Sequence, residues 1–301
     1  MKSVVLTDGG MGQELVRRSR SEPTPLWSAR VLIEEPDLVR DLHVEFIRAG
    51  ARVITINTYS ATPERLAREG AEDLFKPLQK RGIELARQAR DQAGDATIAG
   101  CLSPLFGSYA HALTISFEDT LDIYRRIVAE QAGGVDLFLC ETMASADEAR
   151  AAVTAASESG KPVWVSWTLA DHGQPRLRSG ETIAEAARAL DDLPVAARLV
   201  NCCRPEAVGA ALSELIDLGG AVGAYANGFT SVEALKHGGT VDVLHARHDL
   251  GPDAYADQAL GWVEAGADIV GGCCEVGPAH IAALRDRLQQ AGHEISGVIH
   301  A

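Results

Sequence analysis

The sequence predicts an α/β fold, a (β/α)8 TIM barrel formed as a single domain, and three observations support this. Short apolar runs alternate with amphipathic helical patterns along the chain, which is the order of elements in α/β proteins. The alternation gives eight strand–helix units, the number that closes a TIM barrel. The 301 residues suit one barrel and no shift in composition marks a boundary, so we expect one domain over residues 1–301.

The first four predicted strands are apolar runs that end in polar or glycine residues. Val39, Leu42 and Phe46 recur with the spacing of one helix face, which predicts a helix after the first strand. Thr62 suits a helix N-cap and Pro63 suits the first helical position, which predicts a helix after the second strand. The expected strands are Val4–Gly10, Arg52–Tyr59, Thr97–Pro104 and Val135–Thr142.

The second half of the chain continues the alternation. Pro205 and Pro278 each follow a strand and stand where proline opens a helix. In the last helix, Ile281, Leu284 and Leu288 share one face. The expected strands are Pro162–Leu169, Ala197–Cys202, Ala221–Gly228 and Ala267–Cys273.

Polar residues three positions apart predict the start of three further helices. A Ser or Thr followed at this spacing by an acidic residue forms a capping box, in which each side chain binds the backbone N–H of the other residue. The pairs are Ser116 with Asp119, Ser145 with Glu148, and Thr182 with Glu185.

Two connections, at about 11–35 and about 228–252, are too long to be simple turns. Both follow a strand, so both are expected at the face of the barrel where active sites lie. An open, doubly wound sheet is the rival architecture. Against it, the turn after the first strand is DGGMG and lacks the G-x-G-x-x-G fingerprint of a dinucleotide site.

The formal net charge of −14 argues against binding to nucleic acid or to anionic membranes, because both require basic surfaces. An acidic surface weakly favours a cationic small molecule, and plain solubility is the stronger interpretation. No stretch approaches the roughly 18 consecutive apolar residues of a membrane span, and no signal peptide is recognised. We expect a cytoplasmic protein, a monomer or small homo-oligomer, that binds small molecules.

Four of the six cysteines stand at the predicted ends of two strands. In a cytoplasmic protein, cysteines are better interpreted as thiols or metal ligands than as disulfides. The Cys202–Cys203 pair ends the sixth strand, and the Cys273–Cys274 pair ends the eighth. Only one strand separates these ends in a closed barrel, so their thiols can meet. An ordinary buried position is expected for the other two, Cys101 and Cys140.

Three thiolates suit zinc, and three protein ligands leave the open fourth position of a catalytic site. Neighbours on a strand point to opposite faces, so adjacent cysteines reach one metal only where the strand has turned into a loop. Gly271 and Gly272 are expected to permit that turn. Cys203 is expected to point elsewhere, but its role and that of Cys202 are exchangeable on sequence alone.

Motifs at five strand ends resemble those of the homocysteine S-methyltransferase family. They are DGGMG at the first strand, NTY at the second, ET at the fourth, VNC at the sixth and GGCC at the eighth. They occur in order over nearly the whole chain, and the combination of NC with GGCC is the specific part. The resemblance implies a zinc-dependent barrel enzyme that transfers a methyl group to the sulfur of homocysteine, giving methionine. It also implies that the Zn²⁺ ligands are Cys202, Cys273 and Cys274.

The resemblance further implies how homocysteine is held. Asp8 and Glu141 would bind its ammonium group, while Gly9, Gly10 and Thr58 would help to bind its carboxylate. The chemistry agrees, because two carboxylates suit a cation and backbone N–H groups at a glycine turn suit an anion. No catalytic side chain is expected beyond the metal site, because zinc deprotonates a thiol that binds to it.

The methyl donor is expected to be a cation, because a neutral thioether or amine can then depart. Sulfonium and ammonium groups favour aromatic faces. Trp27, in the first long loop, corresponds to a tryptophan of the betaine-using branch of the family, and Tyr59 is a further candidate. Trp167 is better explained by packing. A sulfonium such as S-methylmethionine or dimethylsulfoniopropionate is preferred as donor, and betaine is possible.

Other barrel chemistries fit the sequence less well. A class I aldolase needs a buried lysine at a strand end, whereas Lys161 precedes a strand and Lys236 lies in the second long loop. A phosphate site could use Gly271 and Gly272, but no lysine or arginine stands beside them.

Three alternatives share the zinc site. The chain could take its methyl group from a separate corrinoid protein, or act on a thiol other than homocysteine. It could also bind zinc without catalysis. His245 and His248, spaced three residues apart in a charged loop, are expected to lie outside the metal site.

Overall fold

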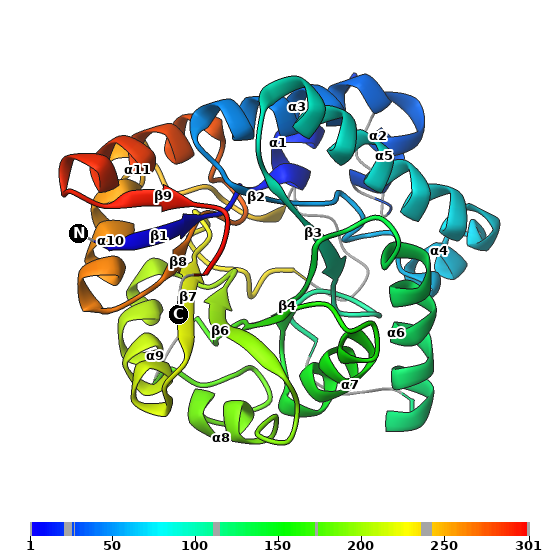
Figure 1. Ribbon diagram of the computed structural model, residues 1–301. Helices are drawn as coiled ribbons and strands as arrows, with labels where there is room; N and C mark the ends of the chain where they lie inside the picture. Colours follow the sequence, from blue (N-terminus) through cyan, green and yellow to red (C-terminus); the bar gives the residue numbers. More distant parts are fainter. Residues whose placement is uncertain are drawn as a thin grey trace.

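Parallel strands form the centre of the molecule and helices surround them (Figure 1). The computed structural model describes residues 2–20, 26, 28–110, 115–171, 174–235 and 243–299, and the statements below concern these residues. The strands are β1 (Ser3–Leu6), β2 (Val53–Thr55), β3 (Thr97–Leu102), β4 (Leu137–Met143), β5 (Val163–Trp167), β6 (Val195–Asn201), β7 (Ala221–Tyr225), β8 (Ile269–Val270) and β9 (Glu294–Ser296).

The sheet closes on itself through β1. Its strand order is β2-β3-β4-β5-β6-β7-β8-β1-β9, so consecutive strands are neighbours from β2 to β8. Val5 of β1 pairs with Ile269 of β8. Directly after β1, Thr7 forms a parallel bridge with Val53 of β2, and the Asp8 N–H donates to the Val53 carbonyl at 2.9 Å. The predicted (β/α)8 barrel is therefore confirmed.

The helices follow the strands as the periodicity predicts. Val39, Leu42 and Phe46 are fully buried, as are Ile281, Leu284 and Leu288 of the last helix. The helices are α1 (Met11–Arg18), α2 (Ser28–Glu34), α3 (Pro36–Ala49), α4 (Pro63–Arg68), the short 3₁₀ helix η1 (Glu72–Leu74), α5 (Phe75–Ala93), α6 (Phe117–Gln131), α7 (Ala146–Ser157), α8 (Ile183–Arg188), α9 (Pro205–Leu218), α10 (Pro252–Ala265) and α11 (Pro278–Gln290).

All the predicted N-caps form, but only one complete capping box does. Thr182 and Glu185 bind each other's backbone N–H at the start of α8. Ser145 caps α7, yet the carboxylate of Glu148 turns inward and accepts hydrogen bonds from the Leu105 N–H (3.2 Å) and the Tyr124 hydroxyl (3.3 Å). The box predicted there is wrong because tertiary partners compete for the carboxylate.

At the start of α6, Ser116 accepts from the backbone N–H of Asp119, as the pair predicts. The Asp119 carboxylate accepts from the Ser116 hydroxyl at 2.8 Å, and no bond to the backbone N–H of Ser116 is seen among the described residues. An aspartate side chain is one methylene shorter than the glutamate of a standard box, which accounts for the difference.

Four strands, β1, β2, β7 and β8, end three or four residues before their predicted ends, and β2 and β8 both lead into candidate site loops. The second strand was expected over Arg52–Tyr59, but β2 ends at Thr55, whose N–H donates to the Asp8 carboxylate at 2.9 Å. The eighth was expected to reach Cys273, but β8 ends at Val270. The chain beyond each end is a loop that carries functional side chains.

Strand β9, which the sequence pattern did not predict, pairs with the first three residues of β1. Ser3 is opposite Glu294 and Val5 is opposite Ser296. The hydroxyl of Thr97 donates to the carbonyl of Gly297 at 2.9 Å, which ties the end of the chain to β3 as well. In Figure 1 the red β9 lies beside the blue β1. β9 thus lies at the end of the barrel opposite the strand C-termini.

Both long connections contain structure of their own. The first, predicted at about 11–35, includes α1 and α2. The second, at about 228–252, begins as a paired segment in which Phe229 bridges Ala246 and the Arg247 N–H donates to the Gly228 carbonyl at 2.7 Å. Among the helices that the structure describes, none has the length and apolar composition of a membrane-spanning helix.

The apolar core has two layers. Strand residues such as Val5, Leu139 and Leu199 fill the inside of the barrel. Residues such as Phe46 and Trp167 pack between the strands and the helices. Because both layers are closely packed, the loops after the strands are held against a rigid base.

Candidate metal centre and active site

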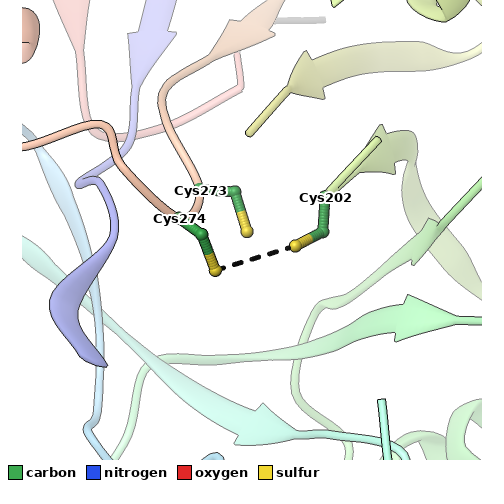
Figure 2. Close-up of side chains that lie close together, drawn as sticks. All are labelled: Cys202, Cys273 and Cys274. Carbon is green, nitrogen blue, oxygen red and sulfur yellow. Dashed lines mark hydrogen bonds between the residues drawn. The ribbon is translucent and has the colours of Figure 1, made fainter. Parts of the chain in front are cut away.

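Three cysteine sulfurs converge at the C-terminal face of the barrel. Cys202 directly follows β6, and Cys273 and Cys274 lie in the loop after β8. Their sulfur atoms all lie within 4.8 Å of one another, and the Cys202 and Cys274 sulfurs are 3.9 Å apart. Figure 2 shows the three side chains pointing toward one another. The structure therefore brings together the sulfurs that the strand order predicts to meet.

The separation of these sulfurs fits a tetrahedral metal ion. A zinc–sulfur bond of about 2.3 Å places two tetrahedral sulfur ligands about 3.8 Å apart. The 3.9 Å between Cys202 and Cys274 is close to this value. All the cysteines are free thiols rather than disulfides. The donor set is therefore three sulfurs, which suits zinc.

The electrostatics of the cluster favour one thiolate. Hydrogen bonds from Cys273 and then Cys274, helped by Tyr109 and Asn227, lower the pKa of Cys202 well below its ordinary value despite burial. The pKa of Cys273 is raised, first because its thiol donates to Cys202. The pKa of Cys274 is raised as well, first by its hydrogen bond with Cys202. A metal ion that binds three thiolates must therefore release protons, so its affinity depends on pH.

The two neighbouring cysteines share one site because the chain turns directly after them. The Cys273 N–H still donates to the Ala226 carbonyl at 3.0 Å, as in a strand. The turn follows at Glu275, whose φ of 66° lies in the left-handed region. The carboxylate of Glu275 accepts hydrogen bonds from Gln13 and Arg17 of α1, each at 2.8 Å. These bonds from α1 hold the strained residue in place.

The glycines before the cysteines serve close packing rather than the turn. The sequence suggested that Gly271 and Gly272 supply unusual backbone angles, but neither has a positive φ. A Cβ on Gly271 would collide with the hydroxyl of Thr7, and one on Gly272 would collide with Val276. Glycine is required at both positions because neighbouring parts of the chain leave no room for a Cβ. Gly271 packs against the segment directly after β1, and Gly272 packs against Val276 of its own loop.

The Gly9–Gly10 turn packs against the loop that carries Cys273 and Cys274. A Cβ on Gly10 would lie 2.5 Å from the Cys273 carbonyl oxygen, and one on Gly9 would collide with the Val276 carbonyl. The Gly10 N–H donates to the same Val276 carbonyl at 2.8 Å. The DGG motif therefore holds the cysteine loop in place, whatever it contributes to substrate binding.

Asp8, which is buried, and Glu141, which is partly buried, are two carboxylates on the same face of the barrel as the cysteines. Burial raises the pKa of Asp8 well above its usual range, against the hydrogen bond from the Thr55 N–H, and the charge of Glu141 raises it further. Burial raises the pKa of Glu141 to about 7, although the Cys101 thiol donates to its carboxylate at 3.1 Å. Two repelling carboxylates with raised pKa values favour a bound cation.

A network around Asn201 fixes the strand ends that carry Glu141 and Cys202. The Asn201 amide oxygen accepts from the Thr142 N–H (2.9 Å) and the Ser166 hydroxyl (2.8 Å), and its Nδ2 donates to the Thr142 hydroxyl (2.9 Å). Thr142 and Cys202 both have positive φ, at 60° and 48°. Sequence reasoning placed these polar residues at adjacent strand ends but did not foresee the network that joins them.

The other predicted substrate residues lie in different places. The hydroxyl of Thr58 accepts from the side-chain amide of Gln131 at 3.4 Å, and its methyl group faces Gly82 of α5. Its side chain is thus directed to the helix layer. The Tyr59 hydroxyl is 2.9 Å from that of Ser108, on the loop after β3. Trp27 lies outside the described residues, so its role on the donor side stays a prediction.

The remaining cysteines and aromatic residues have ordinary positions. Cys203 is fully buried in the core, where burial raises its pKa to about 12, so it does not share the cluster with Cys202. Cys140 and Trp167 are fully buried as well. Cys101 is buried in the core as expected, and its thiol also donates to the Glu141 carboxylate. His245 and His248 belong to no group of potential metal ligands among the described residues.

The sequence did not reveal that Tyr109 is a close neighbour of the three cysteines. Tyr109, in the loop after β3, places its hydroxyl 3.1 Å from the Cys202 sulfur. The sequence offered only an isolated aromatic residue in a loop, with no spacing to link it to a cysteine far along the chain.

Comparisons with known proteins agree with this geometry. Residues 5–288 match the family model described as homocysteine S-methyltransferase. The chain is 32% identical to the homocysteine S-methyltransferase of Escherichia coli K12, over 95% of this chain and 96% of that protein. It is 29% identical to a selenocysteine methyltransferase of Astragalus bisulcatus, over 92% and 90% of the two chains.

A solved structure is also similar. The metallated form of the homocysteine methyltransferase MmuM from Escherichia coli superposes with a TM-score of 0.80 at 32% identity, covering 95% of this chain and 96% of that one.

Proposed function

The chain belongs to the homocysteine S-methyltransferase family, and we propose that it methylates the thiol of L-homocysteine in a zinc-dependent reaction that gives methionine. In this proposal residues 1–301 act as one homocysteine-binding domain. Cys202, Cys273 and Cys274 hold the zinc ion. The observation that carries the proposal is the convergence of these three sulfurs, from two separate strand ends, within 4.8 Å of one another.

The residues of the cluster suit a catalytic rather than a structural ion. Three cysteines supply three of the four ligands that zinc usually takes, which leaves a position for a substrate sulfur. Zinc bound there would supply the positive charge that deprotonates the thiol of homocysteine at neutral pH. No other general base is required in this proposal, because the bound ion itself lowers the pKa of the thiol.

The two carboxylates suit the ammonium group of the acceptor. The charge of Glu141 raises the pKa of Asp8, and burial raises the pKa of both carboxyl groups, so a cation bound beside them is stabilised. We propose that they bind the substrate ammonium. The turn at Gly9 and Gly10, together with Thr58, would take the carboxylate. The Gly10 N–H already donates to the Val276 carbonyl, so the Gly9 N–H would be the backbone donor of the turn. The Thr58 N–H likewise donates to the Ile56 carbonyl, so Thr58 would act through a rotated side chain. This arrangement would direct the homocysteine thiol toward the three cysteines.

For the donor we propose a sulfonium, S-methylmethionine or dimethylsulfoniopropionate, with betaine as the less favoured choice. The methyl carbon forms its bond to the homocysteine sulfur as its bond to the donor heteroatom breaks. The bonding electrons stay with the donor, which departs as a neutral thioether, or as an amine in the case of betaine. Tyr59 and Trp27 are proposed to line the donor side, since aromatic faces attract such cations.

A donor screen tests the proposal. Zinc-loaded protein is mixed with homocysteine and each candidate donor, without any corrinoid protein, and methionine is measured. Turnover with a free sulfonium is expected. Activity only with a methylated corrinoid protein would replace this donor class by the corrinoid alternative. Turnover only with another thiol or a selenol would replace the acceptor.

Cysteine variants test the metal assignment. Cys273→Ser is expected to lose both bound zinc, measured by elemental analysis, and turnover. Cys203→Ser is the matched control, because its thiol is buried in the core away from the cluster. It is expected to keep one zinc per chain. If Cys273→Ser retained metal and activity, that ligand assignment would be wrong.

A further inference from the structure

Three loops meet above Cys202, and Tyr109 is the residue at which they meet. Tyr109 lies in the loop after β3, and the segment after β5 supplies Asp171 and Arg178. The loop after β7 supplies an apolar cluster, against which Tyr109 and Cys274 both pack; its buried members are Phe229, Val232 and Leu244. Tyr109 is therefore held on several sides although it stands in a loop.

The contact with Cys202 is a specific hydrogen bond. The Tyr109 hydroxyl lies 3.1 Å from the Cys202 sulfur. A phenol is a much stronger donor than a thiol, and a cysteine that binds a metal is a thiolate with no proton to give. The hydroxyl is therefore the donor whenever Cys202 is ionised.

The backbone of Tyr109 is strained, so the contact needs outside support. Its φ of 65° lies in the left-handed region, which non-glycine residues adopt at a cost of about 1–3 kcal/mol. Such a conformation persists only where neighbouring groups hold it. Strain of this kind is concentrated at functional sites.

Arg178 and Asp171 provide that support. The Arg178 guanidinium stacks on the Tyr109 ring, with its carbon 4.7 Å from the ring centroid. It pairs with Asp171 at 3.0 Å, and the two side chains are only 11% and 1% exposed. Asp171 also accepts from the Ser231 hydroxyl and the Val232 N–H, both at 2.7 Å. A buried ion pair with these extra bonds is a rigid anchor.

We propose that Tyr109 is a positioning residue for the metal centre: its hydroxyl donates to the Cys202 thiolate, and the Asp171–Arg178 pair keeps it there. This rests on the proposed zinc-dependent function. The hydrogen bond withdraws negative charge from one of three crowded thiolates and fixes the direction of its sulfur. Outer partners of metal ligands commonly act in this way.

The test compares Tyr109→Phe with Tyr124→Phe. Both variants remove a buried phenol hydroxyl, but that of Tyr124 binds the Ser103 carbonyl and Glu148 rather than a cysteine. Zinc affinity is measured by competition with a chelator. Tyr109→Phe is expected to bind zinc roughly 10-fold or more weakly, the usual effect of losing an outer partner, while Tyr124→Phe matches the wild type.

Replacing zinc with cobalt gives an absorption band whose wavelength reports on the cysteine sulfurs and does not change when the protein merely becomes less stable. Removing a hydrogen bond raises the energy of the sulfur lone pairs, so the sulfur-to-cobalt charge-transfer band of Tyr109→Phe is expected at longer wavelength. The band of Tyr124→Phe is expected to stay in place. Unchanged zinc affinity and an unchanged band in Tyr109→Phe would overturn the proposal.

Arg178 variants test the anchor. Arg178→Gln is expected to weaken zinc binding in the same direction as Tyr109→Phe. Arg178→Lys keeps the charge but loses the planar stacking, so it should restore part of the loss. Arg178→Gln with wild-type affinity would remove the anchor from the proposal. Failure of the wild-type chain to bind zinc would instead refute the proposed function itself.

Discussion

Burial sets the chemistry of the carboxylates at the level of single residues. Glu141 stands at the end of a strand, where a carboxylate could as well be solvated, yet it is enclosed by the barrel and its pKa is raised to about 7. Its hydrogen bond from Cys101 only partly offsets the burial. A group with such a pKa is half protonated at neutral pH unless a cation binds beside it.

This predicts a pH dependence for acceptor binding. As the pH falls through about 7, Glu141 gains a proton in the free enzyme and can no longer pair with the substrate ammonium. The kcat/KM for homocysteine is therefore expected to fall below pH 7, since kcat/KM reports the free enzyme.

Glu141→Gln should lower kcat/KM at pH 8 by about 10- to 100-fold, the worth of one charged hydrogen bond, and should remove this step from the profile. Steady-state kinetics from pH 6 to 9 provide the measurement. Glu118→Gln, an exposed change on α6, is the control and should keep the wild-type profile. A Glu141→Gln profile with the same acidic limb would contradict the assignment.

At the level of elements, the metal site depends on how the β8–α11 loop sits against the turn after β1. The two segments are far apart in sequence but touch through backbone atoms, so the Gly9 and Gly10 positions leave no room for a Cβ. Gly10 faces the carbonyl of Cys273 directly. A side chain at Gly10 therefore has to push the cysteine loop away.

Gly10→Ala is expected to move the Cys273–Cys274 segment and to weaken zinc binding by about 10-fold or more, with about 1–3 kcal/mol of lost stability from overpacking. Chelator competition and chemical unfolding measure the two effects. Gly209→Ala is the control, because Gly209 lies within α9 with open space around it. That variant should bind zinc normally and gain up to about 1 kcal/mol.

On the scale of the whole molecule, the two ends of the barrel have separate tasks. The cysteines, Asp8 and Tyr109 lie after the C-terminal ends of strands, and Glu141 lies near the C-terminal end of β4, whereas β9 pairs with the beginning of β1. In this fold, residues at the N-terminal face serve stability and those at the other face serve function. The final strand belongs to the first group.

Removal of residues 294–301 is therefore expected to lower the free energy of unfolding by about 3 kcal/mol. The backbone hydrogen bonds of β9 are lost, and so is the apolar contact that Ile295 and Ile299 make with the core. Zinc affinity of the folded protein should remain within about 2-fold of wild type, because the cysteines are held from the other face. Urea unfolding and chelator competition measure both. An unchanged unfolding midpoint would show that β9 contributes no stability.

The sequence by itself determined the fold class and the meeting of the three cysteines. Alternating periodicities require a parallel sheet covered by helices, and in a closed barrel the ends of the sixth and eighth strands are separated by one strand only. The convergence of Cys202 with the Cys273–Cys274 pair thus follows from chain order. Chain order likewise places Asp8 and Glu141 at the same end of the barrel, although their degree of burial does not follow from it.

Only the tertiary structure decided the contacts between loops. It showed that the turn occurs at Glu275 and that Tyr109 reaches Cys202, and it directed Thr58 toward the helices. It also added β9 to the sheet. The physical reason is common to all four. Each depends on which backbones come into contact once the barrel closes, and no local periodicity or propensity encodes a contact between segments that are distant in sequence.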